Sequence, residues 1–310
     1  MSLELPSTLS PSKVSTFKDC ALAFRFSAID HLPEPPSPAA TKGTLVHLAL
    51  EHLFEREAPE RTLEAAFTDL DRAISEIRTD PDFTELLLDA HAEAAFFADA
   101  RVLVERYFDL EDPREVHPIG LELKLEARIG DLRLRGIIDR LELDADGELV
   151  VTDYKSGRAP TERYEQGRLG GVHFYSFLCE ELFGKRPAKV QLLYLTDPIA
   201  ITTVPTEQSS RGLRNKVGAI WQAVELACKR DDFRPKPGPL CKWCSFQAFC
   251  PAQGGDISLV PAASAAAEAA RHPSGDGGAE VEVGLEVAIA AEAGAADAAD
   301  ATAAHPVAAS

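Results

Sequence analysis

Two short stretches, 136–140 (Gly-Ile-Ile-Asp-Arg) and 150–157 (Val-Val-Thr-Asp-Tyr-Lys-Ser-Gly), decide the fold of this chain. Each holds an apolar run that ends in an aspartate, as in a strand that enters a core. The intervening Asp-Ala-Asp-Gly, 144–147, is typical of a tight turn, since glycine accepts positive φ at little cost. We therefore predict a β-hairpin. A turn centred on Ala145 and Asp146 places Asp139 almost directly across from Asp153.

This hairpin brings together groups that can do chemistry. Residues two apart in a strand share a face, so Asp153 and Lys155 point the same way. Two neighbouring carboxylates repel each other unless a cation lies between them, and Mg²⁺ or Mn²⁺ prefers oxygen ligands. A lysine beside the ion can orient a bound water. This combination of two carboxylates, an ion and a lysine is typical of metal-assisted phosphodiester hydrolysis. The alternative is a solvated face with weak ion pairs; the apolar residues before both aspartates favour burial.

The two stretches resemble the active-site core of the RecB-like branch of the PD-(D/E)XK nucleases. The resemblance covers most of residues 9 to 251. It implies an α/β fold with a restriction-endonuclease-like core, a mixed β-sheet flanked by helices. It also implies that Asp139 and Asp153 bind Mg²⁺ or Mn²⁺ and that Lys155 assists the attacking water. The implied activity is a metal-dependent DNA exonuclease in DNA repair or recombination, acting on single-stranded DNA or free ends.

The same resemblance implies further site residues. His47, in Gly43-Thr-Leu-Val-His47, matches a family histidine that binds metal, and Tyr175 matches a tyrosine that faces the active site. The glutamine that accompanies this tyrosine in the family is replaced by Gly171. The role of two acidic residues is left undecided. Glu51, one helical turn after His47, is either close to the site or a surface residue, and Glu122 is either an outward polar residue of a strand or part of the site.

Three cysteines lie within ten residues, Cys241, Cys244 and Cys250, and indicate a metal site in a chain without a signal peptide. A fourth ligand is not found nearby. Cys179 and Cys228 lie among apolar residues and are expected in the core. The iron–sulfur members of the RecB-like nucleases have one cysteine before the nuclease core and three after it, which implies that Cys20 is the fourth ligand of a 4Fe-4S cluster. Zinc in the same four cysteines is the alternative.

The cluster would join the N- and C-terminal ends of one nuclease domain, residues 1–251. We expect a helix from Ser10 that carries Phe17, Cys20 and Phe26, another over 44–56, and a helical insertion over about 57–115. A strand near 121–125 precedes the hairpin. A helix over 162–183, strands near 190–196 and 202–205, and a helix over 208–230 follow. Residues 252–310 are rich in alanine and acids, lack aromatics, and are predicted to form a disordered tail.

The formal net charge is −18, so no global positive field attracts DNA, and contact requires local basic patches. The candidates are Arg133, Arg135, Arg140, Arg158, Arg163, Arg168, Arg211, Arg214 and Lys216. No phosphate-binding loop of the Gly-x-x-x-x-Gly-Lys-Ser/Thr type occurs, so unwinding would need a helicase or repair partner. The second hypothesis is a non-catalytic DNA-binding module that serves such a partner. We expect a cytoplasmic protein with no membrane segment.

Overall fold

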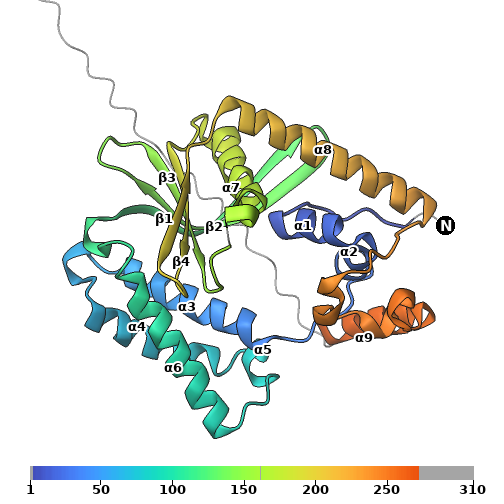
Figure 1. Ribbon diagram of the computed structural model, residues 1–310, viewed down its shortest axis with the longest axis horizontal. Helices are drawn as coiled ribbons and strands as arrows, with labels where there is room; N and C mark the ends of the chain where they lie inside the picture. The colour runs from blue at the N-terminus through green and yellow to red at the C-terminus, as the bar shows by residue number, and fades with distance from the viewer. Residues whose placement is uncertain (1–2, 161, 272–310) are drawn as a thin grey trace, which may run out of the picture. The chain divides into compact units, whose positions relative to one another are not determined.

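A computed structural model describes residues 3–160 and 162–271 and contains one mixed sheet of five strands (Figure 1). The strands follow the order β1-β2-β3-β4-β5. They are β1 (His117–Ile129), β2 (Leu132–Leu143), β3 (Leu149–Lys155), β4 (Lys189–Tyr194) and β5 (Ile199–Thr203). Strands β3 and β4 pair in parallel, joined by helix α7 (Glu162–Phe183), and the other neighbours are antiparallel. The predicted α/β class with a mixed sheet flanked by helices is confirmed.

The predicted hairpin is formed by β2 and β3. Arg140 pairs with Thr152, so continuing the register by one residue sets Asp139 opposite Asp153. In the turn, the amide of Gly147 donates to the Asp144 carbonyl, and Gly147 has φ of 74°, a region that favours glycine.

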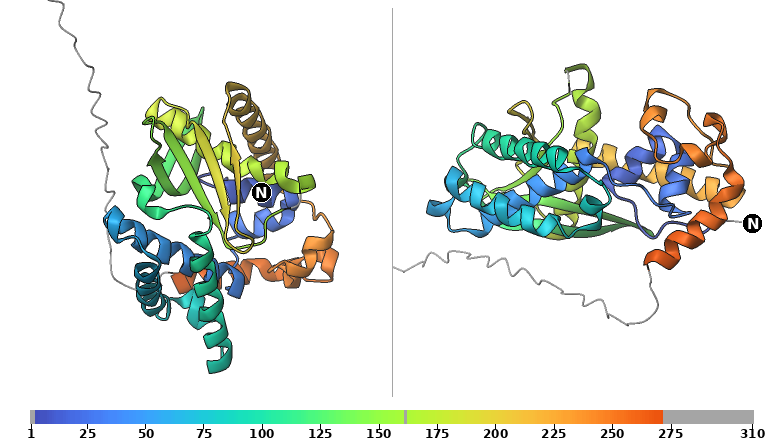
Figure 2. Two further views of the ribbon diagram at one scale, coloured as in Figure 1. Left: turned by 60° about the vertical axis from the view of Figure 1, so that its left-hand side comes forward. Right: turned by 90° about the horizontal axis from the view of Figure 1, so that it is seen from below.

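Helices cover both faces of the sheet (Figure 2). Among the described residues, buried apolar side chains form two separate cores. One core joins Val151 of β3 and Leu192 of β4 to helices α1 (Pro11–Asp19), α2 (Ala21–Ala28), α7 and α8 (Glu207–Arg230). The other joins Tyr154 and Leu193 to α3 (Pro38–Glu55), α4 (Leu63–Ile77), α5 (Pro81–Thr84) and α6 (Ala90–Tyr107). Because helices cover both faces, every residue of β3 from Leu149 to Tyr154 is buried, Thr152 and Asp153 included.

The segment predicted as one helix from Ser10 is two helices. Ser10 caps α1 as expected, and its side chain accepts from the Lys13 amide. The prediction of a continuous helix is wrong at Cys20, which is extended with φ of −159° and separates α1 from α2. Before α1, Leu9 exchanges backbone hydrogen bonds with Arg133 and Arg135 of β2. This contact fixes α1 beside the sheet.

The chain does not lose its structure at residue 252, where the sequence suggested that a tail begins. After α8 come the 3-10 turns η3 (Pro239–Trp243), η4 (Gln247–Phe249), η5 (Pro251–Gln253) and η6 (Ile257–Leu259), then α9 (Val260–Arg271). Val260 is buried, and Ser264 Oγ donates to the Asp30 carbonyl. Residues 272–310 of the predicted tail lie outside the described residues. Two further turns, η1 (Ala58–Glu60) and η2 (Pro113–Glu115), flank the helices before β1.

Within the described residues, no helix is long and apolar enough to span a bilayer.

Candidate active site

Helix α3 brings His47 to the end of β3. The approach is close because Gly43 has no side chain: a β-carbon there would lie 3.1 Å from Ser156 Oγ. Four residues later, His47 Nε2 lies 3.2 Å from the carbonyl oxygen of Tyr154, and Nδ1 lies 3.5 Å from Asp139 Oδ2. The predicted histidine and the predicted first aspartate therefore meet in space, although they are far apart in sequence.

Glu122 of β1 lies on the other side of Asp139. The pairs Leu121–Arg140 and Leu123–Ile138 set Glu122 opposite Asp139 in the register. Its Oε1 lies 3.8 Å from His47 Nδ1. The backbone of Glu122 is left-handed, with φ of 43°, which costs on the order of 1 kcal/mol for a residue with a β-carbon. At this strained position the Glu122 carboxylate lies close to His47 and Asp139.

These three side chains form a compact donor set. One ligand atom each from His47, Glu122 and Asp139 lies within 4.8 Å of the others. Two carboxylates and an imidazole are ligands that suit Mn²⁺ and, for the oxygens, Mg²⁺. Glu122 was one of the two acids whose role the sequence left undecided, because an alternating strand pattern cannot reveal a single residue with left-handed backbone.

Asp139 and Asp153 are crowded together in the absence of a cation. Burial and the Asp153 carboxylate raise the pKa of Asp139 to about 7, against the opposing influence of His47. The amide of Tyr154 donates a 2.6 Å hydrogen bond to Asp139 Oδ2, which holds this carboxylate in place. Desolvated like charges of this kind are a site for a bound cation.

Lys155 lies against Asp153, as the two-residue spacing predicts. Its ammonium contacts Asp153 Oδ2, and Asp153 is buried while Lys155 is partly exposed. Burial lowers the pKa of Lys155, but Asp153 and Asp139 outweigh burial and the net shift is upward. Lys155 therefore stays charged at neutral pH and borders solvent, where a water or phosphate can reach it.

Tyr175 of α7 packs over β2 beside the two aspartates. Burial and then Asp153 raise its pKa, so the phenol stays protonated. A β-carbon at Gly136 would lie 3.2 Å from Tyr175 Cε1, so the missing side chain makes room for the tyrosine. Glu51 is also near the site, since burial and Glu122 raise its pKa. Gly171 leaves open space where the family has glutamine.

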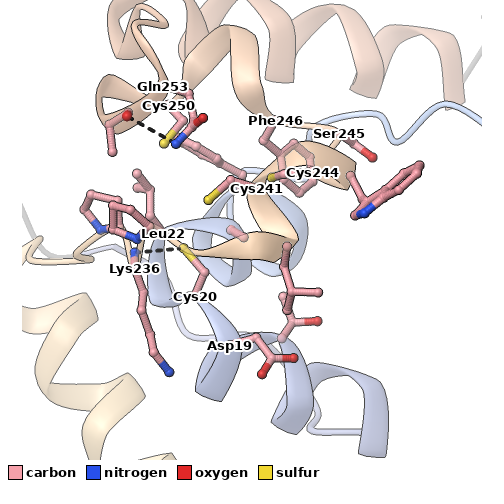
Figure 3. Close-up of a pocket in the computed structure, with 18 of the residues that line it drawn as sticks. Asp19, Cys20, Leu22, Lys236, Cys241, Cys244, Ser245, Phe246, Cys250 and Gln253 are labelled. Atoms are coloured by element: carbon pink, nitrogen blue, oxygen red, sulfur yellow. Dashed lines mark hydrogen bonds between the residues drawn. The ribbon is translucent and has the colours of Figure 1, made fainter.

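The four predicted cysteine ligands gather at a second place. Cys20, Cys241, Cys244 and Cys250 line one cavity of about 230 Å³, and Figure 3 shows their sulfurs around it. Burial raises the pKa of the Cys244 thiol, and the other three cysteines are close enough to raise it further. In contrast, Cys179 and Cys228 are buried in the sheet core, as expected.

Two of these sulfurs already accept backbone hydrogen bonds. The amide of Lys236 donates to Cys20 Sγ at 3.4 Å, and that of Gly238 donates to Cys241 Sγ at 3.3 Å. Such bonds stabilise thiolates that hold a metal or cluster. The break between α1 and α2 turns Cys20 toward this loop.

The basic residues proposed for DNA contact separate into two groups. Arg140 is wrong as a contact, since it is fully buried and binds Glu111, Glu142 and the Tyr154 hydroxyl. Five others either lie near a carboxylate or have side chains that the structure does not describe. Arg133 lies near Glu126, Arg211 and Arg214 pair with Glu207 and Glu181, and the side chains of Arg163 and Arg168 lie outside the described part. Arg135, Arg158 and Lys216 remain exposed.

The fold and this arrangement of acids, histidine and lysine define a nuclease core. Residues 8–251 match the PD-(D/E)XK nuclease superfamily, and the chain belongs to it.

The chain is also similar to individual proteins. The Gene 69 protein of Mycobacterium phage D29 is 24% identical over 78% of this chain and 96% of its own length. The Gene 69 protein of phage L5 is 25% identical over 43% of this chain, and the match spans only 44% of that relative. Among solved structures, the "Putative exonuclease" from Eubacterium rectale aligns with a TM-score of 0.50 at 12% identity, over 77% of this chain and 87% of that one. This likeness is one of fold.

Proposed function

We propose that this protein is a metal-dependent DNA exonuclease of the RecB-like type. The observation that carries the proposal is the convergence of His47, Glu122 and Asp139 next to Asp153 and Lys155. Family membership supports hydrolysis of phosphodiester bonds, and the donor set supports a divalent ion. A role in DNA repair or recombination, with a helicase or repair protein as partner, is part of the same proposal.

In this proposal, one group of residues binds the metal ion and Lys155 positions the attacking water. His47, Glu122, Asp139 and Asp153, with the Tyr154 carbonyl, would hold Mg²⁺ or Mn²⁺. When bound, the ion supplies Lewis-acid polarisation of the phosphate and acidifies water. Asp153 fixes the Lys155 ammonium through their direct contact. Lys155, partly exposed, would orient the attacking water and offset charge on the phosphate. Tyr175 would donate a hydrogen bond from its protonated phenol at the edge of the site.

We also propose that the four cysteines hold a 4Fe-4S cluster with a structural role. The donor set fits, because a cubane cluster takes four thiolates. All four cysteines border one cavity, as the ligands of a single group must. Joining residue 20 to residues 241–250 would tie α1 and α2 to the C-terminal end of the domain. A brown protein that absorbs near 400 nm and contains iron supports this assignment; zinc in place of iron contradicts it.

The experiment for the nuclease uses anaerobically purified protein, Mn²⁺, and single-stranded DNA in two forms, a linear strand and a closed circle, both labelled internally. An exonuclease degrades the linear strand and leaves the circle intact. Asp153→Asn and Lys155→Gln should each lower the cleavage rate by at least about 100-fold. Lys185→Gln, which removes an exposed lysine paired with Glu148, is the matched control and should cleave like the parent.

Equal cleavage by the parent and both active-site variants would contradict the proposal. Tight binding of DNA without any metal-dependent cleavage would select the second candidate, a non-catalytic DNA-binding module that serves a helicase or repair partner. The feature that favours this second candidate is Gly171, which leaves α7 without the family glutamine.

A further inference from the structure

Five basic residues from four parts of the chain lie in linked contacts outside the active site. They are Arg135 of β2, Lys13 and Lys18 of α1, Lys216 of α8, and Lys236 of the loop before the cysteines. We call them the basic strip. Among the described side chains, those of residues 3–160 and 171–268, none of the five forms an ion pair with a carboxylate, although the chain carries a net charge of −18. In an acidic protein, cations that gather without carboxylate partners require an external anion or a solvated surface.

The strip begins on the strand that carries Asp139. Arg135 is exposed and lies four residues before Asp139 in β2. The amide of Arg135 donates to the Leu9 carbonyl, which brings the start of α1 to the same place. Burial lowers the pKa of Lys13 on the first turn of α1, and Arg135 lowers it further, so the two cations are neighbours.

The middle of the strip crosses a cleft between three helices. The cleft is lined by Lys18 and Ser15 of α1, Gly171 and Phe174 of α7, and Lys216 of α8. Both lysines are exposed. Burial lowers the pKa of Lys216, and the adjacent Lys18 ammonium lowers it further. Two ammonium groups on opposite sides of a cleft repel each other, and an anion between them would relieve that repulsion.

The far end of the strip reaches the cysteine loop. Lys236 Nζ donates to the Lys18 carbonyl at 3.1 Å, and the Lys236 amide donates to Cys20 Sγ. Trp243, on the wall of the cysteine cavity, is 85% exposed. Asp19 and Glu34 are acids on the same wall, so the positive character belongs to the strip rather than to this cavity. An exposed indole offers a flat surface on which an unpaired base can stack.

We propose that the basic strip binds the phosphate backbone of single-stranded DNA and guides it between the catalytic cluster and the cysteine loop. The proposal rests on the proposed nuclease function and names the surface that holds its substrate. Charge complementarity selects the phosphate backbone, and the exposed Trp243 selects a single strand, whose bases are free to stack.

The test measures equilibrium binding of a fluorescein-labelled 20-nucleotide oligo(dT) to the full chain, without added divalent ions, so that binding is read without cleavage. The test variant is the double substitution Lys18→Gln and Lys216→Gln. The control is Lys229→Gln with Arg230→Gln, the same charge change at the end of α8 and about 20 Å further along that helix. The arginine double variant, Lys18→Arg with Lys216→Arg, preserves charge.

We expect the glutamine double variant to bind at least about tenfold more weakly at 0.1 M salt, and its salt dependence to fall by about 1.4 in the log–log slope, near 0.7 for each lost phosphate contact. The control and the arginine variant should bind like the parent. A hairpin duplex of equal length should bind more weakly than oligo(dT). Parent-like binding by the glutamine variant, an equal loss in the control, or an equal preference for duplex would overturn the proposal.

Failure of this inference can be told apart from failure of the proposed function. If the glutamine variant binds normally while Asp153→Asn abolishes cleavage, the strip is not the substrate track and the nuclease stands. If the parent never cleaves but the glutamine variant loses binding with the reduced salt slope, the strip is a DNA surface and the nuclease fails.

Discussion

The amide of Tyr154 donates a 2.6 Å hydrogen bond to Asp139 Oδ2, across the β2–β3 pair. The carbonyl of the same residue lies 3.2 Å from His47 Nε2. One peptide segment of β3 therefore positions both a carboxylate from β2 and an imidazole from α3. Asp153 comes immediately before it and Lys155 immediately after it. The spacing Asp-x-Lys places the two side chains on one face while the residue between them organises the rest of the cluster through its backbone.

Asp139→Asn should stabilise the metal-free protein while removing its activity. Burial and Asp153 raise the pKa of Asp139, so its charge at pH 8 costs folding free energy that a neutral amide does not. Asn keeps an oxygen for the Tyr154 amide. Chemical denaturation at pH 8 without metal should show a gain on the order of 2 kcal/mol. Asp146→Asn, in the exposed turn, is the control and should change stability little. A loss of stability in Asp139→Asn would contradict the described crowding.

Mn²⁺ binding should weaken as the pH falls below about 7. The raised pKa of Asp139 means that the folded protein binds a proton there that the unfolded chain releases near pH 4. Metal-free stability should therefore decline as pH rises from about 4 to about 7, and metal must displace this proton at pH 6. Burial lowers the pKa of His47, but Glu122, Asp139 and Asp153 outweigh it, so His47 also carries a proton at pH 6. Calorimetry in buffers of different ionisation enthalpy should therefore detect more than one proton released per Mn²⁺ at pH 6 and fewer at pH 8.5. Equal proton release at both pH values would refute this coupling.

Gly136→Ala should destabilise the protein and disturb Tyr175. The new β-carbon would lie 2.8 Å from Leu178 Cδ1 and 3.2 Å from Tyr175 Cε1, so α7 must shift or change rotamers, at about 1–3 kcal/mol. The matched control is Gly212→Ala in α8, where nothing lies within 4 Å of the new carbon. That substitution should instead stabilise by about 0.5–1 kcal/mol, since alanine is the better helix former. Thermal melts that move both variants in the same direction would contradict the described packing.

Cys244→Ser should remove absorption near 400 nm and lower stability, because four thiolates are needed to hold the cluster. The cluster closes a loop from residue 20 to residue 241. From the entropy of closing a loop of that length, losing the cross-link should lower the free energy of unfolding by about 5 kcal/mol. Cys228→Ser changes a cysteine of the sheet core and should keep the absorption. Iron content measured in both variants separates cofactor loss from loss of packing. If Cys244→Ser keeps full iron and colour, these cysteines do not hold the cluster.

The sequence predicted the elements that depend on local pattern. The hairpin, its turn at Gly147 and the helix over 162–183 agree with the structure, because alternation and turn chemistry act over a few residues. The break at Cys20 and the order after residue 252 were missed. Both depend on tertiary contacts, such as that of Cys20 with Lys236 and that of Ser264 with Asp30.

The sequence did not show where several residues of the candidate site and its surroundings lie in the folded protein. Glu122 reads as an ordinary outward residue of a strand, and only its left-handed backbone directs it to His47. Arg140 follows the aspartate in an apparently exposed position, yet its guanidinium is buried against Glu111 and Glu142. Lys13, Lys18 and Lys236 carry no sequence signal, because their proximity arises from α1, α8 and a distant loop.

We propose that His47, Glu122, Asp139 and Asp153 share one divalent ion. Anomalous scattering at the manganese edge, from crystals soaked in Mn²⁺, should show one strong peak bounded by these four side chains and the Tyr154 carbonyl. Crystals of Asp139→Asn should show no peak there. Density for manganese elsewhere, with these side chains turned toward solvent and bare of metal, would contradict it.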